Sequence, residues 1–339
     1  MVSKSVESRK VQKTGLSTIT VSLPKDWVAS NNLKAGDQVN LEVMADGSLS
    51  VDPKERKKRE PVRKIVMVEK DDTPEHLSRK LIGAYLAGFN IIEVRSKERM
   101  DLDTKHAVKD FARLVIGPEV IEETANTLVM HDLSDPVELP QKKCVRRMHL
   151  IVDSMHRDAI TAFIEGDGSL ARDVIDRDQD VDRLYWMTVK QFNLIQADRS
   201  LAERIGVDIY ESMSLMLVAR MMERIGDHAE KIARHALEVE NKKECERELG
   251  KMAALSKDAL DTLRESIECY FLREINASNA TIDRAEGLVR QAEQLIPELQ
   301  GLPGKGAATK TSVLDSVVRT MMYSTDIAEL AINEAMRER

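Results

Sequence analysis

The sequence predicts a mixed, mainly α-helical chain that begins with a small β domain and continues through a small α/β domain into long helices. Two patterns carry this prediction. Apolar and polar residues alternate over residues 17–23, as in a strand, whereas apolar residues recur at helical spacing over residues 221–236. With 339 residues, the chain is long enough for two or three domains of ordinary size.

The composition indicates a soluble, helix-rich protein with an aliphatic core, since 32% of the residues are charged, 42% are hydrophobic and 4% are aromatic. The three cysteines, Cys144, Cys245 and Cys269, have no paired spacing, as expected of reduced thiols in the cytosol. No apolar run is long enough to span a membrane, and the first 30 residues lack the hydrophobic region of a signal peptide. We therefore expect a cytoplasmic protein that reaches a membrane only through a partner.

Residues 1–53 predict a small β domain, here called the head. The sequence alternates as a strand over residues 17–23, and Asp46-Gly47 is typical of a hairpin turn between strands at 38–43 and 48–52. Because so short a segment buries little core alone, we expect the head to oligomerise.

The head is basic, whereas the rest of the chain is acidic. Residues 1–60 hold 11 Lys and Arg against 8 Asp and Glu, although the whole chain has a net charge of −7. So modest a surplus would present a convincing surface to nucleic acid only in a dimer. The charged run at residues 54–61 is interpreted as a hydrated linker, with a nucleic-acid-binding patch as the alternative.

Residues 62–140 alternate between strand and helix patterns and predict a small α/β domain. Residues 65–68 and 90–94 have strand patterns, and Thr73-Pro74 is typical of a helix start, with Thr as the cap and Pro in the first position. This part of the sequence contains no glycine-rich phosphate loop and no nucleophile elbow. A ligand-sensing module and a rigid spacer both fit it.

Glu223 and Asp227 lie one turn apart on the polar face of the helix predicted over residues 221–236. Like charges at this spacing destabilise a helix by about 0.2–0.5 kcal/mol. Gly226, expected to open the surface beside them, costs roughly 1 kcal/mol relative to Ala. A hard cation bound by the carboxylate oxygens would compensate both effects. The alternative is a solvated helix face balanced by neighbouring Arg and Lys.

A second carboxylate pair, Asp178 and Asp182, has the same spacing on another predicted helix. If a helical bundle brings the two pairs together, four carboxylates could line one metal site. Histidines also recur in pairs seven residues apart, at His149 and His156 and at His228 and His235. Seven helical residues span about 10.5 Å. Neither histidine pair can therefore share an ion, and we expect surface or packing roles.

The helical part of the chain resembles the PhoU family of phosphate-signalling regulators. Glu223-Arg224-Ile225-Gly226-Asp227-His228-Ala229, followed by Glu230-Lys231-Ile232-Ala233, is similar to the signature helix of a PhoU domain. Residues 174–184 resemble the second helix of a PhoU repeat. The resemblance implies two tandem three-helix repeats, at residues 141–245 and 246–339. It also implies an E(D)-x-x-x-D motif in each repeat, which binds an iron or zinc cluster in some members.

The second repeat is a fainter copy of the first. Residues 319–329 align with residues 220–230 at an offset of 99, but Met322 occupies the position of Glu223, so only Asp326 remains of the carboxylate pair. A thioether is a poor ligand for hard cations. We therefore expect a divalent, iron or zinc ion at the first repeat, with Asp326 as a weaker candidate ligand in the second.

The head resembles the AbrB/SpoVT swapped-hairpin DNA-binding domain in its order of strand, Leu-Pro-Lys, short helix, Leu-x-x-Gly-Asp and Asp-Gly hairpin. The resemblance implies a dimer that presents basic residues of the N-terminal strand and loop to DNA, here Arg9, Lys10, Lys13 and Lys25. Leu16 stands where many members have Arg. The order of the three parts resembles archaeal PhoU-type regulators.

These resemblances imply a phosphate-responsive transcriptional regulator that is not an enzyme and that binds DNA as a homodimer. The alternative is an adaptor that restrains a phosphate transporter or a sensor kinase without binding DNA. A metal-dependent hydrolase is disfavoured, because a carboxylate pair supplies neither a nucleophile with its base nor an oxyanion-binding donor set.

Overall fold

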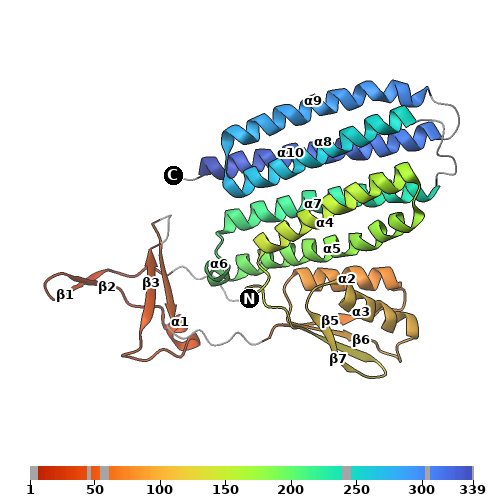
Figure 1. Cartoon of the computed structure of the whole chain (residues 1–339). Coiled ribbons are helices and arrows are strands. Elements are labelled where there is room, and N and C mark those ends of the chain that lie inside the picture. Colours follow the sequence, from red (N-terminus) through yellow and green to blue (C-terminus); the bar gives the residue numbers. More distant parts are fainter. Residues whose placement is uncertain (1–6, 44–46, 54–60, 239–245, 302–305, 338–339) are drawn as a thin grey trace. The chain divides into compact units, whose positions relative to one another are not determined.

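The computed structural model divides into two compact units, Met1–Pro61 and Val62–Arg339, each of which is described by itself (Figure 1). The structure describes residues 7–43, 47–53, 61–238, 246–301 and 306–337. The predicted linker at 54–61 lies outside these residues except for Pro61, and so does Asp46 of the predicted hairpin turn. Among the described residues, no helix has both the length and the apolar character needed to cross a membrane.

The head consists of two antiparallel hairpins and one short helix, α1 (Lys25–Ser30). The first hairpin pairs β1 (Gln12–Thr14) with β2 (Thr18–Thr20), and the second pairs β3 (Val39–Val43) with β4 (Leu49–Pro53). Gly15 lies in the first turn with a φ of 71°, a conformation that favours glycine.

Within the described residues of the head, none is buried. Seven large hydrophobic side chains of these strands and loops are more than half exposed: Val11, Leu16, Ile19, Val21, Leu41, Val43 and Leu49. Two hairpins that expose this much apolar surface lack a core of their own, and isolated hairpins are marginally stable in water. The single chain therefore leaves the head incomplete.

The second unit begins with a four-stranded sheet covered by two helices. The strands are β5 (Arg63–Met67), β6 (Ile91–Arg95), β7 (Pro118–Glu123) and β8 (Thr127–Asp132), and the helices are α2 (Pro74–Leu86) and α3 (Leu102–Leu114). The sheet order is β5-β6-β8-β7, with β5 parallel to β6 and the other pairs antiparallel. We call this part the α/β layer.

Local signals fix the helix starts of the α/β layer. Thr73 caps α2 by accepting a hydrogen bond from the His76 backbone N–H, as its sequence predicts, and Asp101 caps α3 in the same way through Thr104. Tyr85 and Phe111 meet edge to face in the core between the helices and the sheet.

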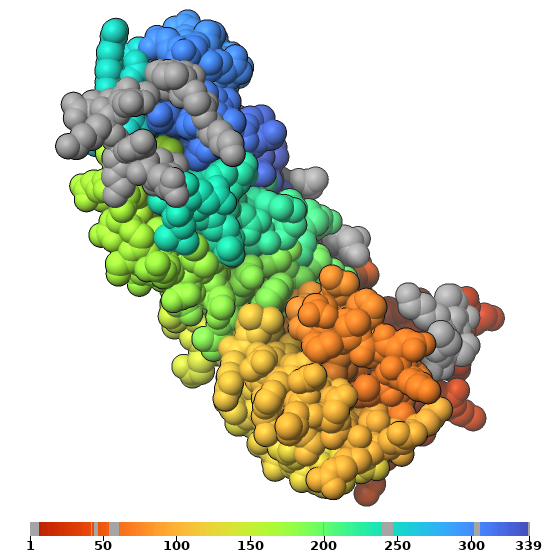
Figure 2. All heavy atoms as spheres, turned by 90° about the vertical axis from the view of Figure 1, so that its right-hand side faces the viewer, coloured from red at the N-terminus to blue at the C-terminus, as the bar shows by residue number. Residues whose placement is uncertain are grey.

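Two three-helix bundles follow the α/β layer. The first contains α4 (Gln141–Glu165), α5 (Gly168–Ala197) and α7 (Ile209–Glu238), and the second contains α8 (Glu246–Leu272), α9 (Ile275–Gln300) and α10 (Gly306–Arg337). A short helix, α6 (Arg199–Ile205), also connects α5 to α7. The predicted mainly α-helical fold, with its small β head, is confirmed. Figure 2 shows the second bundle, the first bundle and the α/β layer in a row.

The two bundles share one hydrophobic core, in which α7 packs on α10 and α4 on α8. The four bundle histidines lie along this contact, which confirms packing roles for at least two of them. His156 is fully buried, with Nδ1 3.2 Å from Ser256 Oγ of α8, and His235 Nε2 lies 3.0 Å from Ser312 Oγ of α10.

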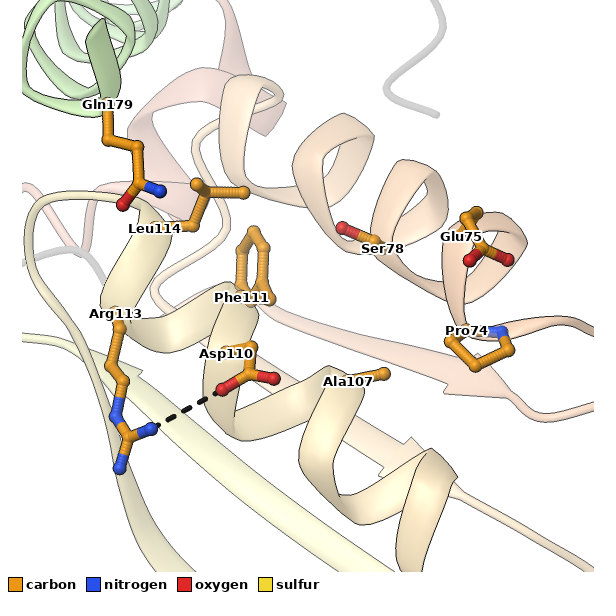
Figure 3. Close-up of a pocket in the computed structure, with 9 residues that line it drawn as sticks. All are labelled: Pro74, Glu75, Ser78, Ala107, Asp110, Phe111, Arg113, Leu114 and Gln179. Atoms are coloured by element: carbon orange, nitrogen blue, oxygen red, sulfur yellow. Dashed lines mark hydrogen bonds and ion pairs between the residues drawn. The ribbon is translucent and has the colours of Figure 1, made fainter. Parts of the chain in front are cut away.

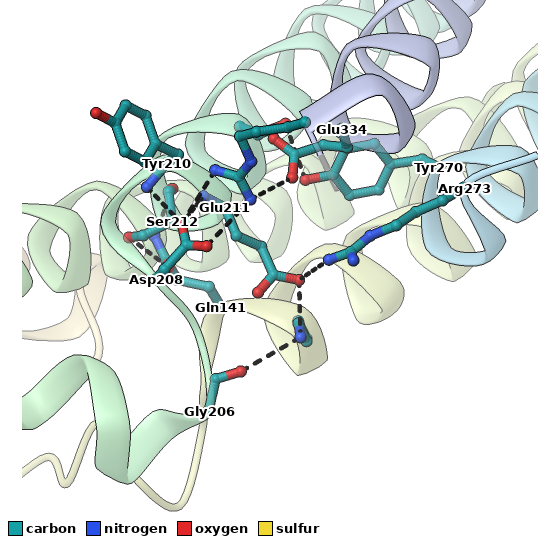
Figure 4. A network of polar contacts seen from close by, with 12 residues as sticks. Gln141, Gly206, Asp208, Tyr210, Glu211, Ser212, Tyr270, Arg273 and Glu334 are labelled. Carbon is teal, nitrogen blue, oxygen red and sulfur yellow. Dashed lines mark hydrogen bonds and ion pairs between the residues drawn. The ribbon is translucent and has the colours of Figure 1, made fainter. Parts of the chain in front are cut away.

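A polar network holds one end of the two bundles together (Figure 4). Glu211 at the start of α7 accepts from Lys142 at 2.8 Å and from Arg273, which follows α8, at 3.3 Å. Arg337 at the end of α10 donates to Asp208 at 3.1 Å. The buried amide of Gln141 donates to the Ser212 carbonyl oxygen at 3.2 Å. The contacts of Arg273 and Arg337 join the two bundles, whereas those of Lys142 and Gln141 lie within the first bundle.

A buried ion pair joins the α/β layer to the first bundle. Lys190 of α5 is paired with Asp132 at the end of β8, and its ammonium lies 3.1 Å from Ser134 Oγ and 4.4 Å from the ring centre of Tyr85. The side chains of Lys190 and Asp132 are 2% and 8% exposed. Burial lowers the pKa of Lys190, while Asp132 opposes that shift.

Candidate functional site

The first bundle brings together the two carboxylate pairs that the sequence singles out. Asp178 and Asp182 lie one turn apart on α5, and Glu223 and Asp227 lie one turn apart on α7. The helices α5 and α7 pack against each other, and the four carboxylates interact electrostatically across this contact. We call these four residues the carboxylate cluster.

Burial and mutual repulsion raise the pKa values of the carboxylate cluster. The pKa of Asp178 is raised to about 7, first by burial and then by Asp182 and other acidic neighbours. The pKa of Asp182 is raised to about 6 by burial and then by Asp227, and that of Glu223 to about 7 by the same two causes. The cluster therefore concentrates negative charge that favours binding a proton or a cation.

Two arginines contact the carboxylate cluster but do not fully neutralise its negative charge. Arg220 donates to Glu223 Oε1 at 2.8 Å, and an Arg224 nitrogen lies 3.5 Å from Asp227 Oδ2. Glu223 Oε2 is buried and accepts no hydrogen bond from any described residue. Arg224 Nε approaches it only to 3.8 Å. A buried carboxylate oxygen without a donor is costly, so the cluster can accept a further positive partner.

Gly226 brings α7 close to α5 at the carboxylate cluster. A Cβ at this position would lie 3.3 Å from Asp178 Oδ1 and 3.4 Å from Val181 Cγ1. Gly226 is buried, so the expectation that it opens the surface is wrong. Its missing side chain instead allows the close contact that places Asp178 beside the carboxylates of α7.

The chemistry of the carboxylate cluster fits a hard cation. Four carboxylates supply oxygen ligands, and the orphaned Glu223 Oε2 is a ligand atom in need of a partner. As the side chains are placed, no three Asp, Glu, His or Cys residues of the described chain converge closely enough to hold one ion. Binding would therefore require the carboxylates to turn toward a common centre.

Glu230 also belongs to the surroundings of the carboxylate cluster, although we did not predict it. It raises the pKa values of Asp178, Asp182 and Asp227. Its spacing of seven residues from Glu223 on the same helix is the sequence signal that could have revealed it. Arg234 pairs with Glu230 at 2.5 Å and partly neutralises it.

The second bundle does not reproduce the carboxylate cluster. The motif Ile282-Asp283-Arg284 repeats Ile175-Asp176-Arg177 at an offset of 284 − 177 = 107, which places Ala285 and Val289 where α5 has Asp178 and Asp182. Asp326 lies on α10, where burial and then Glu329 raise its pKa. None of the four carboxylates of the first bundle is among the groups that shift the pKa of Asp326.

The structure places the predicted DNA contacts on the exposed surface of the head. Arg9 and Lys10 precede β1, Lys13 lies within β1, and Lys25 is the first residue of α1. All four are exposed, and Arg9 forms an ion pair with Glu7. Three of these cations therefore lie within five residues along one edge of the first hairpin.

The chain thus combines a small hairpin head, an α/β layer and two three-helix bundles, the first of which carries facing carboxylate pairs. The family model "PhoU domain" matches residues 145–236, and "Antidote-toxin recognition MazE, bacterial antitoxin" matches residues 12–59. The chain thus carries a PhoU domain behind a head of the MazE/AbrB-like antitoxin type, as its sequence predicts. PhoU domains are regulatory, and a head of this type is compatible with DNA binding.

Solved PhoU structures resemble the helical part of this chain. PhoU from Pseudomonas aeruginosa has 18% sequence identity and a TM-score of 0.51, covering 60% of this chain and 98% of its own. The phosphate transport system regulatory protein PhoU from Streptococcus pneumoniae has 17% identity and a TM-score of 0.49, covering 59% and 94%. The first of these likenesses shows a shared fold. None of the curated proteins matches the chain.

Proposed function

We propose that this protein is a phosphate-responsive transcriptional regulator whose head binds DNA as a homodimer. The observation that carries the proposal is the head itself, which combines a row of exposed cations with apolar surface that a single chain cannot bury. Pairing two heads would cover the apolar side chains and double the basic surface. The match to the PhoU domain supports the proposed role in the response to phosphate.

Dimerisation explains why the head needs no core of its own. Burial stabilises by about 25 cal/mol for each Å² of apolar surface, so seven exposed hydrophobic side chains represent a large stabilisation available only on association. A second copy of the head presents the same strands. An interleaved pair of hairpins would therefore bury both sets at once.

The carboxylate cluster is proposed to hold a metal ion, a divalent cation or an iron or zinc centre. Asp178, Asp182, Glu223 and Asp227 would supply the ligands, while Asp326 lies apart from them. A bound cation would neutralise the repulsion that raises the pKa values and would fix α5 against α7. Metal binding in this way would change how α5 and α7 pack against each other.

Genome-wide DNA occupancy in phosphate-rich and phosphate-starved cells tests the proposed function. We expect occupied sites near phosphate-transport genes that change with phosphate supply and that disappear when Arg9, Lys10 and Lys13 are replaced by Ala. An absence of occupied sites in both conditions, with the protein instead recovered on a phosphate transporter or a sensor kinase, would replace the regulator with an adaptor.

A further inference from the structure

A cavity of about 500 Å³ lies where the α/β layer meets the first bundle. Its walls come from α3, from the loop and start of β7, and from α5. Three cationic side chains line it, Lys109 and Arg113 of α3 and Arg183 of α5, against one carboxylate, Glu119. Residues of α3 and α5, which are distant in the sequence, thus give this open cavity a surplus of positive charge.

The cations that line this cavity form only weak ion pairs with the protein's own carboxylates. Arg113 lies 3.4 Å from Asp110 with both side chains mostly exposed, and Arg183 lies 3.9 Å from Asp180. Exposed pairs of this kind stabilise by about 0–1 kcal/mol. A dianion held by two guanidinium groups would make shorter, charge-assisted hydrogen bonds and would displace such contacts at little cost.

Two further contacts point in the same direction. Arg183 Nε is buried and has no hydrogen-bond partner among the described residues. Its N–H group is therefore a donor that a ligand could satisfy. Lys109 pairs with Glu123 at 2.9 Å, but Glu123 also accepts from Lys105 at 2.7 Å. One carboxylate shared by two lysines leaves part of their charge available to a ligand.

A second cavity, of about 460 Å³, adjoins the first and shares Arg113 with it (Figure 3). In Figure 3, Arg113 extends from α3 below Gln179 of α5, while Phe111 and Leu114 form the apolar wall. Gln179 and Arg183 are one turn apart on α5, so both cavities lie along the same helix. A ligand with both a phosphate group and an apolar ring could occupy both.

We propose that Lys109, Arg113 and Arg183 form a binding site for a compact oxyanion with two or more negative charges, of the phosphate class. The source is either free inorganic phosphate, held in the cationic cavity alone, or the phosphate groups of a nucleotide whose ring extends into the adjoining cavity. The site gives the α/β layer a ligand-sensing role. It rests on the phosphate-responsive part of the proposed function but does not depend on DNA binding.

Occupancy of this site would act directly on the helix that carries half of the carboxylate cluster. Arg183 follows Asp182 in α5, and an oxyanion bound to Arg113 and Arg183 would connect α3 to α5. Free energy gained by holding the two helices together favours the conformation in which they are closest. The anion site and the carboxylate cluster are therefore placed to influence each other through one helix.

The chain contains its own reporter for this site. Trp186 lies three residues after Arg183 on α5 and packs against the core of the α/β layer. The chain has two tryptophans, and the other, Trp27, lies in the head. In a full-length Trp27→Phe background, tryptophan fluorescence therefore reports only on the neighbourhood of the proposed site.

The test titrates this protein with inorganic phosphate, ADP and chloride at constant ionic strength. We expect a saturable fluorescence change with phosphate or ADP but not with chloride. Joint Arg113→Gln and Arg183→Gln replacement should weaken binding at least tenfold. Arg290→Gln, which removes an exposed arginine of α9 paired with Glu286 at 3.6 Å, should leave binding unchanged. Thermal melts establish that each variant is folded, and the highly exposed Arg113→Gln variant alone should show a smaller loss.

Two outcomes distinguish the sources of the oxyanion. Equal affinity for phosphate and ADP identifies free phosphate as the ligand, whereas ADP binding that is at least tenfold tighter and is reduced by Ser78→Phe, which fills the adjoining cavity, identifies a nucleotide. The proposal is overturned if neither anion gives a saturable change, or if the folded double arginine variant binds as tightly as its parent.

Discussion

At the residue scale, the carboxylate cluster around the buried oxygen of Glu223 leads to opposite predictions for a mutation with and without a bound cation. If the cluster holds a cation, Asp227→Asn removes a ligand and should lower the melting temperature of protein purified without chelator, by the equivalent of roughly 1–3 kcal/mol. Without a cation, the same change relieves repulsion and is neutral or stabilising. Thermal melts with and without EDTA, together with elemental analysis, distinguish the two.

Asp326 provides an internal control for this experiment. It aligns with Asp227 but faces Met322 instead of a second carboxylate, so Asp326→Asn should change the melt much less. A metal-free parent whose melt ignores EDTA, with Asp227→Asn as stable as the parent, would remove the metal from the carboxylate cluster.

His156 should make the stability of the protein depend on pH. Burial lowers the pKa of His156 from 6.5 to about 4. Between pH 6.5 and pH 4, this histidine is therefore protonated in the unfolded chain but stays neutral in the folded protein. This contribution to stability is complete above pH 6.5 and declines below it. Between pH 8 and pH 5, the free energy of unfolding of His156→Gln should therefore decrease by roughly 2 kcal/mol less than that of the parent.

Urea unfolding of the parent and His156→Gln at pH 8 and pH 5 gives this difference. The carboxylate cluster has raised pKa values and acts in the opposite sense, since its repulsion is relieved as pH falls. It is present in both proteins and cancels from the comparison. Equal losses in the two proteins would show that His156 accepts its proton in the folded state.

At the scale of elements, local signals predicted much of this fold. Thr73-Pro74 marks the start of α2 because the cap and the proline act through adjacent backbone atoms, and the spacing of Glu223 and Asp227 identifies the polar stripe of α7. Helical spacing also placed Asp178 and Asp182 on one face. These features need only neighbours along the chain.

The remaining features depend on contacts between distant segments. The role of Gly226 follows from the approach of α5, and the burial of Lys190 follows from docking of the α/β layer on α5. Lysine is normally exposed, so its sequence pattern gave no sign of a buried partner. The cationic cavity likewise depends on tertiary structure, because Arg113 of α3 and Arg183 of α5 line it from segments distant in the sequence.

The Lys190–Asp132 pair should be a main determinant of how the α/β layer docks on the first bundle. Lys190→Met leaves the Asp132 carboxylate buried without its cation, which should cost about 3–5 kcal/mol in the free energy of unfolding. Adding Asp132→Asn removes the orphaned charge and keeps an acceptor for Ser134, so the double variant should recover more than half of the loss. Urea denaturation measures both, and a double variant no more stable than the single one would contradict this role.

At the scale of the whole molecule, the head should be a dimer. Leu41 is 63% exposed in the single chain, where a polar replacement would change stability little. In a dimer that buries β3, Leu41→Asp places a charge in the interface and should shift the protein strongly toward monomer. Sedimentation velocity over a range of concentrations measures this shift, with Leu102→Asp, at an exposed position in the α/β layer, as the control. Identical association of both variants with the parent would place the dimer contact elsewhere.

Retention of duplex DNA by the purified protein tests the central claim most directly. We expect binding that weakens steeply with salt and is abolished by joint replacement of Arg9, Lys10 and Lys13 with Ala, while the dimer persists. The control variant replaces three exposed cations of the α/β layer, Lys70, Arg79 and Lys97, with Ala. It removes the same charge elsewhere and should leave most DNA binding intact. Unchanged retention by the head variant, or no retention by the parent at low salt, would contradict a DNA-binding head.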